Sequence, residues 1–511
     1  EQDRVFRGLT ELLGKGASGA LLFGVTGSGK TAVYIHLIRA CLAQGRSALL
    51  LVPEIALTPQ MVSWFRERFG PVAAVLHSSL SAGERYDEWR RIRRGEARVV
   101  IGARSAVFAP TEQLGLIVVD EEHESTYLND HRPRYDAREV AASRCGREGA
   151  ALILASATPS ILSFAKARRG DYMLLEMPHR VENRPLPEVR LTDMRQELES
   201  GNRSVISREL QQELLTCMRR KEQAMLLMNR RGYHSFVSCR SCGTVVKCPH
   251  CDISMTYHLR DNDGRLKCHY CGEEMPIPTR CPQCGSAYIK FFGAGTQKVE
   301  EEIHRLLPGV ATVRMDVDTT GGKDGHGRLL EEFRSGRARI LIGTQMIAKG
   351  LDFPRVTLVG VIAADLTLHL PDYRSRERTF QLLTQVAGRA GRGSRPGKVI
   401  IQTYQPEDPV LGYAAKQDYR AFFEAEFQRR RQALYPPFTV MARLLIEGET
   451  EENVVQAARD LEAEVLETLA REPGWKKKVL LMTDDMPAVK LLRGKHRRQL
   501  LFKLLAGDAT E

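Results

Sequence analysis

The clearest candidate for chemistry is a glycine-rich loop near the N-terminus, Gly24-Val-Thr-Gly-Ser-Gly29-Lys30-Thr31. It follows an apolar run and precedes a helical pattern, which is the context of a phosphate-binding P-loop. The glycines would let backbone N–H groups converge on phosphate oxygens, Lys30 would place a positive charge at the β and γ phosphates, and the Thr31 hydroxyl would ligate Mg²⁺. The alternative, a glycine-rich turn that arose by chance, is disfavoured by this context. The predicted nucleotide-binding residues are Gly24, Thr26, Gly27, Ser28, Gly29, Lys30 and Thr31, with Gln2 as a candidate contact to the adenine.

An acidic box, Asp120-Glu-Glu-His123, follows a second apolar run. Asp120, at the end of the predicted strand, can hold the magnesium shell, and Glu121 can orient and deprotonate the water that attacks the γ-phosphate. Glu122 and His123 are expected to support them. A solvated acidic turn is the usual interpretation of three consecutive acids, but a P-loop in the same predicted domain favours a hydrolytic site.

Two further segments could respond to the nucleotide. Ser156-Ala-Thr158 closes another apolar run, where hydroxyls could sense hydrolysis, although an ordinary polar turn is equally compatible with these residues. Arg389 and Arg392, three residues apart, are expected to share one helical face and to reach the phosphates from a second domain. An arginine supplied in this way is worth about 10³ to 10⁵ in rate. The alternative is a glycine-flanked basic helix that contacts phosphate or solvent, which the segment 343–352 disfavours.

Eight of the eleven cysteines form four Cys-x-x-Cys turns within 46 residues. Each turn presents two thiolates to one ion, so four turns fit two tetrahedral zinc sites. Disulfides are the alternative, which a reducing compartment disfavours. Spacing alone leaves three pairings of the four turns open. The predicted ligands are Cys239, Cys242, Cys248, Cys251, Cys268, Cys271, Cys281 and Cys284, whereas Cys41, Cys145 and Cys217 are expected to be ordinary thiols.

Short apolar runs that alternate with helical patterns predict two parallel sheets. The runs of the first half are 20–23, 48–52, 99–101, 116–119 and 152–154, and those of the second half are 224–228, 310–315, 340–342, 357–362 and 399–404. The chemical motifs follow these runs, at the carboxyl edge where ligands bind in open parallel sheets. A proline-containing connector is expected within 160–205. After Pro436-Pro437, a strand, a helix over 451–471 and two more strands predict a small α+β domain.

Composition sets the class of protein. A chain of 511 residues with 43% hydrophobic residues is expected to form several globular domains. Its net charge of +12 is compatible with nucleic-acid binding without proving it. No apolar run reaches the roughly 18 residues of a membrane span, and the N-terminus lacks a signal-peptide pattern, so the cytoplasm is expected. The chain opens at Glu1 without a methionine, which suggests that an upstream segment is missing.

Two segments could contact nucleic acid directly. Between Tyr127 and Arg138, tyrosines are interleaved with arginines and His131, so that bases could stack on the rings and guanidiniums could hold phosphates. A solvated loop with one packed tyrosine is the alternative. Near the C-terminus is a basic run that could equally be a solvated face. It comprises Lys490, Arg493, Lys495, Arg497 and Arg498.

In this order, GVTGSGKT, DEEH, SATPS, GTQMIAKGLDF and QVAGRAGRG resemble the motifs of superfamily 2 helicases. The wording LVPEIALTPQ, IGARSA, LMNRRGY and LLTQVAGRAGRG is similar to the PriA family of replication-restart helicases, also called primosomal protein N′, without its N-terminal DNA-binding domains. The resemblance implies a 3′-to-5′ ATP-dependent DNA helicase that acts in replication restart and primosome assembly at stalled forks. It also implies ATP, Mg²⁺ and two Zn²⁺ as cofactors.

The resemblance further implies nested zinc sites, with the first and fourth cysteine turns sharing one ion and the second and third sharing the other. Implied partners are single-stranded and forked DNA, single-stranded DNA-binding protein and other primosome proteins, with no membrane, and a monomer is expected. The alternatives are a zinc-stabilised DNA-binding scaffold for primosome loading, or an RNA helicase.

The expected fold is α/β, with two RecA-like parallel-sheet lobes, a two-zinc cysteine module inserted in the second lobe and a small α+β C-terminal domain. The predicted ranges are 1–200 for the first lobe, 201–238 and 285–435 for the second, 239–284 for the zinc module and 436–511 for the C-terminal domain.

Overall fold

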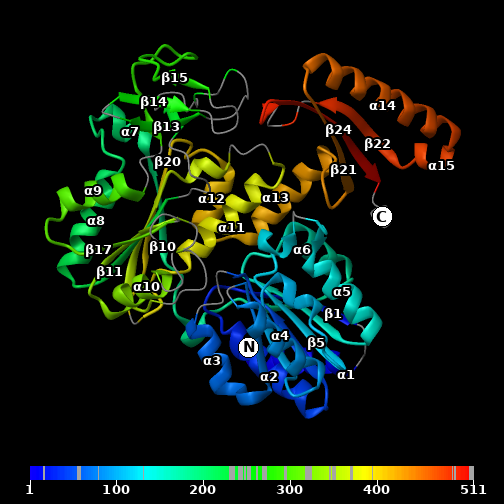
Figure 1. Ribbon diagram of the computed structural model, residues 1–511. Helices are drawn as coiled ribbons and strands as arrows, with labels where there is room; N and C mark the ends of the chain where they lie inside the picture. Colours follow the sequence, from blue (N-terminus) through cyan, green and yellow to red (C-terminus); the bar gives the residue numbers. More distant parts are fainter. Residues whose placement is uncertain are drawn as a thin grey trace.

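Two parallel β-sheets form the body of the protein in the computed structural model (Figure 1). The structure describes residues 1–505 except 15–17, 55–58, 79, 130–131, 229–235, 240–245, 247–248, 250–254, 261–262, 268–272, 293–295, 317–324, 345–346, 348–352, 369–371, 394, 486 and 488–490. The first sheet has the strand order β3-β4-β2-β5-β8-β1-β9 and the second has the order β10-β20-β19-β11-β18-β17. These are the two RecA-like lobes that the alternating pattern predicts.

The first sheet is covered on both faces, so its central strands are buried along their length. Helices α1 (Gln2–Gly14), α2 (Lys30–Ala43) and α3 (Pro59–Phe69) pack on one face, and α4 (Ala82–Arg93), α5 (Ala137–Glu148) and α6 (Ile161–Arg169) pack on the other. Continuous apolar strands are what such two-sided burial requires. The strands are β1 (Ser18–Gly24), β2 (Ser47–Leu51), β3 (Ala73–Leu76), β4 (Val99–Gly102), β5 (Leu114–Asp120), β8 (Ala151–Ser156) and β9 (Met173–Met177).

The second sheet is built in the same way, from β10 (Glu188–Asp193), β11 (Gln223–Met228), β17 (Thr312–Met315), β18 (Ile340–Gly343), β19 (Val356–Ile362) and β20 (Lys398–Thr403). β10 falls within the range 1–200 predicted for the first lobe, yet it pairs in parallel with β20. Its alternating, half-exposed side chains mark an edge strand, which an apolar-run pattern does not detect. The chain therefore crosses between the sheets after β9 and before β10. The other domain bounds stay predictions.

Two smaller units are attached to the second lobe. Five antiparallel strands lie between β11 and α9 (Thr296–Leu306) in the chain: β12 (Phe236–Cys239), β13 (Thr256–Arg260), β14 (Asp263–Lys267), β15 (Glu274–Pro276) and β16 (Ile289–Phe292). The C-terminal unit pairs β24 (Lys495–Leu505) with β21 (Thr439–Gly448), β22 (Val479–Asp485) and β23 (Leu491–Leu492), and α14 (Glu451–Arg471) packs on this sheet. The bounds of α14 match the predicted helix.

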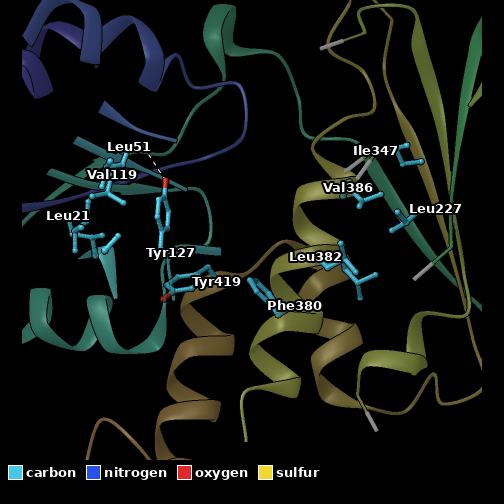
Figure 2. Close-up of a cluster of buried hydrophobic side chains, with 14 of the residues drawn as sticks. Leu21, Leu51, Val119, Tyr127, Leu227, Ile347, Phe380, Leu382, Val386 and Tyr419 are labelled. Atoms are coloured by element: carbon cyan, nitrogen blue, oxygen red, sulfur yellow. Dashed lines mark hydrogen bonds between the residues drawn. The ribbon is translucent and has the colours of Figure 1, made fainter. Parts of the chain in front are cut away.

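The two lobes share a hydrophobic cluster (Figure 2). Helix α11 (Ser375–Ala387) and helix α13 (Tyr419–Gln432) lie between the sheets (Figure 1). The ring of Tyr419 is 5.0 Å from that of Phe23 and 5.1 Å from that of Phe164 in the first lobe, and 6.0 Å from that of Phe380 in the second. The lobes are therefore in direct contact. Among the described residues, no helix is both long enough and apolar enough to span a bilayer.

Candidate functional site between the two lobes

The glycine-rich loop has the backbone of a phosphate cradle. Gly27 and Gly29 have φ angles of +82° and +88°, in the left-handed region that favours glycine, and helix α2 begins at Lys30. A Cβ at Gly24 would lie 2.7 Å from Ser28 Oγ, so glycine is required there too. Ser28 Oγ is buried without a hydrogen-bond partner. A buried hydroxyl without a partner, next to the N-terminus of α2, fits a phosphate oxygen.

Lys30 and Gln2 are held by backbone carbonyls of this loop. Lys30 Nζ donates to Gly24 O at 2.8 Å, and Gln2 Nε2 donates to Ser28 O at 3.2 Å. Burial lowers the pKa of Lys30, and the nearby carboxylates of Glu121 and Asp120 oppose that shift. The predicted lysine, the acidic box and the N-terminal glutamine therefore converge on one loop.

The acidic box begins where β5 ends. Tyr34 donates its hydroxyl to Asp120 Oδ1 at 2.9 Å. Burial, with the negative charge of Glu121 beside it, raises the pKa of Asp120 to about 6. Glu121 has a φ of +47°, and its buried Oε2 accepts no hydrogen bond. Two carboxylates with unused acceptor capacity, next to a phosphate cradle, fit a divalent cation and a water.

Glu122 has a structural position instead. Its side chain is fully buried and accepts hydrogen bonds from Ser160 N at 2.6 Å and Ser163 Oγ at 2.8 Å, at the start of α6. Its own N–H donates to Ala155 O at 3.0 Å. Glu122 therefore fixes the acidic box to the end of β8 and to the start of α6, because its N–H bonds to the strand and its carboxylate accepts from the helix.

His123 connects the two lobes. Its Nδ1 lies 2.7 Å from Ser156 Oγ, and its Nε2 lies 2.7 Å from Gln385 Nε2 on α11. With the glutamine amide as donor to Nε2, the imidazole proton sits on Nδ1 and is donated to Ser156. A continuous polar path thus runs from the Ser-Ala-Thr segment through the acidic box to the second lobe.

Two more residues on the same face of α11 contact the first lobe. Glu377, Gln381 and Gln385 are spaced by four residues and so lie on the same side of the helix. Glu377 Oε1 accepts from Ile161 N at 2.9 Å, and Gln381 Nε2 donates to Thr158 O at 3.4 Å. The sequence analysis missed Glu377 and Gln381. Polar residues at every fourth position of an otherwise buried helix are the signal that could have identified them.

The prediction that Arg389 and Arg392 share a helical face is wrong. Helix α11 ends at Ala387, and both arginines lie in the turn that follows, where Gly391 has a φ of +69°. We call residues 388–393 the arginine turn. The cap of α11 is Gly388, and Gly391 adopts the left-handed conformation three residues later, where other residues would be strained.

The arginine turn nevertheless reaches the phosphate cradle. A Cβ on Gly388 would lie 2.1 Å from Thr26 Oγ1, so only glycine permits this approach of the second lobe to the P-loop. Arg392 Nε donates to Gly388 O at 2.9 Å. Besides burial, the charges of Arg392 and Arg389 lower the pKa of Lys30, which places both guanidiniums within electrostatic range of its ammonium.

Three of the predicted zinc ligands converge. The Sγ atoms of Cys239, Cys281 and Cys284 all lie within 4.8 Å of one another, with 3.5 Å between Cys239 and Cys284. Cys284 N lies 3.5 Å from Cys281 Sγ, a turn in which a backbone amide supports the thiolate. Zn–S bonds of about 2.3 Å place tetrahedral sulfurs roughly 3.8 Å apart, so the cluster fits zinc. Cys242, Cys248, Cys251, Cys268 and Cys271 lie outside the described residues.

Three family models match the chain. These are the DEAD/DEAH box helicase domain over residues 7–165, the PriA DNA helicase Cys-rich region domain over 248–276 and the helicase conserved C-terminal domain over 289–394. The replication restart protein PriA of Bacillus subtilis is 56% identical over 438 residues, covering 86% of this chain and 54% of the relative. That of Synechocystis is 49% identical, covering 85% and 53%.

A third relative decides the family. The replication restart protein PriA of Rickettsia conorii is 39% identical over 442 residues, covering 86% of this chain and 68% of its own length. The chain belongs to the PriA family. It spans about half the length of the Bacillus and Synechocystis PriA proteins. Among solved structures, RecG bound to a three-way DNA junction is similar at 16% identity and a TM-score of 0.47, covering 84% of this chain and 46% of that one.

The predicted aromatic contact to bases fails at Tyr127. In this PriA-family chain Tyr127 is fully buried, and its hydroxyl donates to Asp120 O at 2.6 Å and Leu51 O at 3.1 Å (Figure 2). Arg138 is also engaged, since it pairs with Asp136 and donates to Glu122 O at 2.7 Å. Residue type does not report burial, so the sequence could not separate a packed tyrosine from a stacking one. His131 lies outside the described residues.

The remaining predicted segments lie only in part within the described residues. Arg497 in the basic run is partly buried, and its Nε lies 2.8 Å from Glu447 Oε1, so it pairs within its sheet. Lys490, and residues 345–346 and 348–352 of the motif that begins at Gly343, lie outside the described residues. The three thiols that form no Cys-x-x-Cys turn are buried, and burial raises the pKa of Cys41 to about 11, that of Cys145 to about 12 and that of Cys217 to about 11.

Proposed function

We propose that this chain is the motor of an ATP-dependent DNA helicase that moves 3′ to 5′ and acts in replication restart and primosome assembly at stalled forks. The observation that carries the proposal is the contact between the lobes at Gly388 and Thr26, where the arginine turn lies on the P-loop. A site shared by two lobes can couple hydrolysis to their relative movement. The matching Cys-rich region model is described as that of the PriA DNA helicase, which supports DNA as the substrate.

Each predicted residue has a role that fits its position. The amides of Gly27 and Gly29, with Ser28, would hold phosphate oxygens, and Gln2, on the rim of the loop, would contact the adenine. Thr31 and Asp120 would hold Mg²⁺, which when bound neutralises phosphate charge. Glu121, whose Oε2 accepts no hydrogen bond, would orient and deprotonate the attacking water.

The cations have a separate role. Lys30 would exchange its carbonyl partner for the phosphates, and Arg389 and Arg392 would stabilise charge that develops during cleavage. Movement of the arginine turn away from Thr26 would leave Lys30 without them. Closure of the lobes would therefore be required for turnover.

We further propose two zinc ions, one of them on Cys239, Cys242, Cys281 and Cys284 and the other on Cys248, Cys251, Cys268 and Cys271. The thiol cluster at Cys239 supports the first. We also propose that the protein acts as a monomer in the cytoplasm on single-stranded and forked DNA, with single-stranded DNA-binding protein and other primosome proteins as partners. The family membership supports these partners.

Unwinding assays test the proposal. Wild type is expected to unwind a duplex with a 3′ single-stranded tail in the presence of Mg·ATP, and the Lys30→Ala variant is not. A duplex with a 5′ tail should be a poor substrate, and a matched RNA duplex should compete weakly. If the protein unwinds RNA as efficiently as DNA, an RNA helicase is favoured. If Lys30→Ala still unwinds both substrates, the protein is not an ATP-driven motor.

A further inference from the structure

The segment that connects the lobes is hydrogen-bonded to the P-loop. Val25 N donates to Met177 O at 3.0 Å, and Val181 N donates to Gly27 O at 3.0 Å. Two backbone bonds thus fix residues 177–181 beside the cradle, on either side of Arg180. The P-loop and the connector therefore move together.

The side chain of Arg180 reaches across to the arginine turn. It is only 6% exposed. Its Nη2 donates to Gly388 O at 3.3 Å, and its Nη1 donates to Gly391 O at 3.4 Å and Ala390 O at 3.5 Å. A planar guanidinium can bind several carbonyls at once, which an ammonium cannot do with the same geometry. Arg180 thus joins three carbonyls of the turn, those of Gly388, Ala390 and Gly391, to a segment that is hydrogen-bonded to the P-loop.

Arg184 adds a second contact from the same connector. Its Nη1 donates to Arg392 O and, at 3.3 Å, to Gly393 O. Arg184 is more exposed and also pairs with Glu182. The two connector arginines together bind every carbonyl of the arginine turn except that of Arg389.

Arg180 is charged but has no acidic partner among the described residues. Its bonds all go to backbone carbonyls, and its buried Nε has no acceptor. Burial and the charges of Arg392 and Arg184 lower the pKa of Arg180 to about 10, so it stays protonated at neutral pH. A buried cation without a counter-charge is costly. A polyanion held by Lys30 nearby would offset that cost.

We propose that Arg180 is a positioning residue for ATP hydrolysis, which holds Arg389 and Arg392 at the P-loop by binding the carbonyls of Gly388, Ala390 and Gly391. The inference rests on the proposed function, because it assigns Arg180 to the same site. It makes the connector part of the catalytic arrangement and not only a covalent link. The guanidinium acts through the turn and does not itself have to touch the phosphates.

Two variants in the full chain, with zinc bound, test this role. Arg180→Gln keeps hydrogen-bond donors but loses the charge and the fork, and Arg180→Lys keeps the charge and donors but loses the planar fork. Arg190→Gln is the matched control, because Arg190 lies just after the same connector and pairs with Glu188 and Glu209 on the surface. Hydrogen exchange of nucleotide-free protein reports the turn directly, since the amides of Gly388, Arg389, Ala390 and Gly391 are all hydrogen-bonded.

We expect exchange at residues 388–391 to be about tenfold faster in Arg180→Gln, intermediate in Arg180→Lys and unchanged in Arg190→Gln. Affinity for ADP·AlF₄⁻ should fall by about 10- to 100-fold in Arg180→Gln, while affinity for ADP changes by less than about threefold. In an Arg389→Ala/Arg392→Ala background, Arg180→Gln should cause no further loss of ADP·AlF₄⁻ affinity.

Wild-type exchange rates in the turn of Arg180→Gln would overturn the inference, as would equal losses of ADP and ADP·AlF₄⁻ affinity. If Arg180→Gln does not fold, faster exchange confined to the turn in Arg180→Lys supports the role, and unchanged exchange there overturns it. The exchange experiment needs no hydrolysis. It therefore tests whether Arg180 holds the turn independently of the nucleotide experiments. If wild type binds ADP·AlF₄⁻ no better than Lys30→Ala does, that result contradicts the proposed function instead.

Discussion

Gln385 and His123 meet across the two lobes, with 2.7 Å between their Nε2 atoms. The histidine belongs to the acidic box and the glutamine to the helix that precedes the arginine turn. Because His123 also contacts Ser156, a change in the position of α11 alters contacts of both the acidic box and the Ser-Ala-Thr segment. The contact gives the lobes a direct means of communication, and it can be tested by substitution.

We predict that His123→Ala and Gln385→Ala each lower ATP turnover at saturating single-stranded DNA by about tenfold or more, and that the double variant is no worse than the worse single one. Steady-state turnover measures this. The exposed Gln456 of α14 bonds only to Asp460, so Gln456→Ala is the control and should leave turnover unchanged. If the fold-losses in turnover of the two single variants multiply in the double variant, the two side chains act independently.

A buried charge network joins α11 to α13. Arg430 is bonded to Glu377 at 2.7 Å and to Glu426 at 2.9 Å, and all three side chains are buried. Arg430→Met leaves the buried Glu377 carboxylate without its cationic partner, while Glu426 keeps Arg429, and we expect it to lower the free energy of unfolding by about 3–5 kcal/mol.

Arg420→Met, on the same helix, is the control for Arg430→Met. Arg420 pairs with Glu176 on the surface, with 63% of its side chain exposed, so a loss of about 0–1 kcal/mol is expected. Urea unfolding of both variants provides the comparison. Similar losses would mean that the buried network does not fix the helix.

The raised pKa of Asp120 gives a pH-dependent prediction for nucleotide- and magnesium-free protein. A carboxyl group whose pKa rises from 3.8 to about 6 on folding favours the folded state fully below pH 3.8, and this contribution is lost as pH rises through about 6. Asp120→Asn cannot ionise and can still accept the Tyr34 hydrogen bond. We expect its melting temperature to exceed that of wild type at pH 7.5 and the difference to vanish near pH 4.

Asp171→Asn is the control for this pH profile. Asp171 is exposed, and its hydrogen bond from Arg169 lowers its pKa, so its loss should not stabilise the protein at pH 7.5. An Asp120→Asn variant that is destabilised at pH 7.5 and not at pH 4 would contradict the assigned cause of the pKa shift.

Zinc content tests the cysteine assignments. Wild type is expected to hold two zinc ions per chain, and Cys284→Ser one, because replacing one thiolate of a Cys₄ site weakens that site without touching the other. Cys217→Ser, which removes a buried thiol outside the cluster, should retain both. Elemental analysis after gel filtration gives the counts. A wild-type content of one ion, or loss of zinc from Cys217→Ser, would refute the two-site assignment.

Much of the fold was predictable from apolar periodicity. The buried strands of both sheets and the helix α14 each have an apolar pattern that is visible within a short stretch of sequence. Half-exposed edge strands such as β10 carry a weaker pattern, and the sequence analysis also missed β3, an edge strand of the first sheet.

The site was predictable where one segment performs the chemistry, as in the P-loop. It was not predictable where two lobes must meet. Tyr127 was assigned to bases because burial depends on tertiary packing, and Arg180 was missed because its carbonyl partners lie about 210 residues away in the chain. Arg389 and Arg392 were correctly expected near the phosphate cradle but were placed on a helix instead of in a turn. Gly388, which allows the close approach to Thr26, is also where the helix ends.

The central claim is that ATP is hydrolysed between the lobes when DNA is bound. ATP turnover with and without saturating single-stranded DNA, in wild type, Lys30→Ala and Arg392→Ala, tests it most directly. We predict strong stimulation of wild type, no turnover by Lys30→Ala, and Arg392→Ala slowed by about 10³-fold or more with ADP binding retained. Wild-type turnover that DNA does not raise above that of Lys30→Ala, or full activity of Arg392→Ala, would contradict the account.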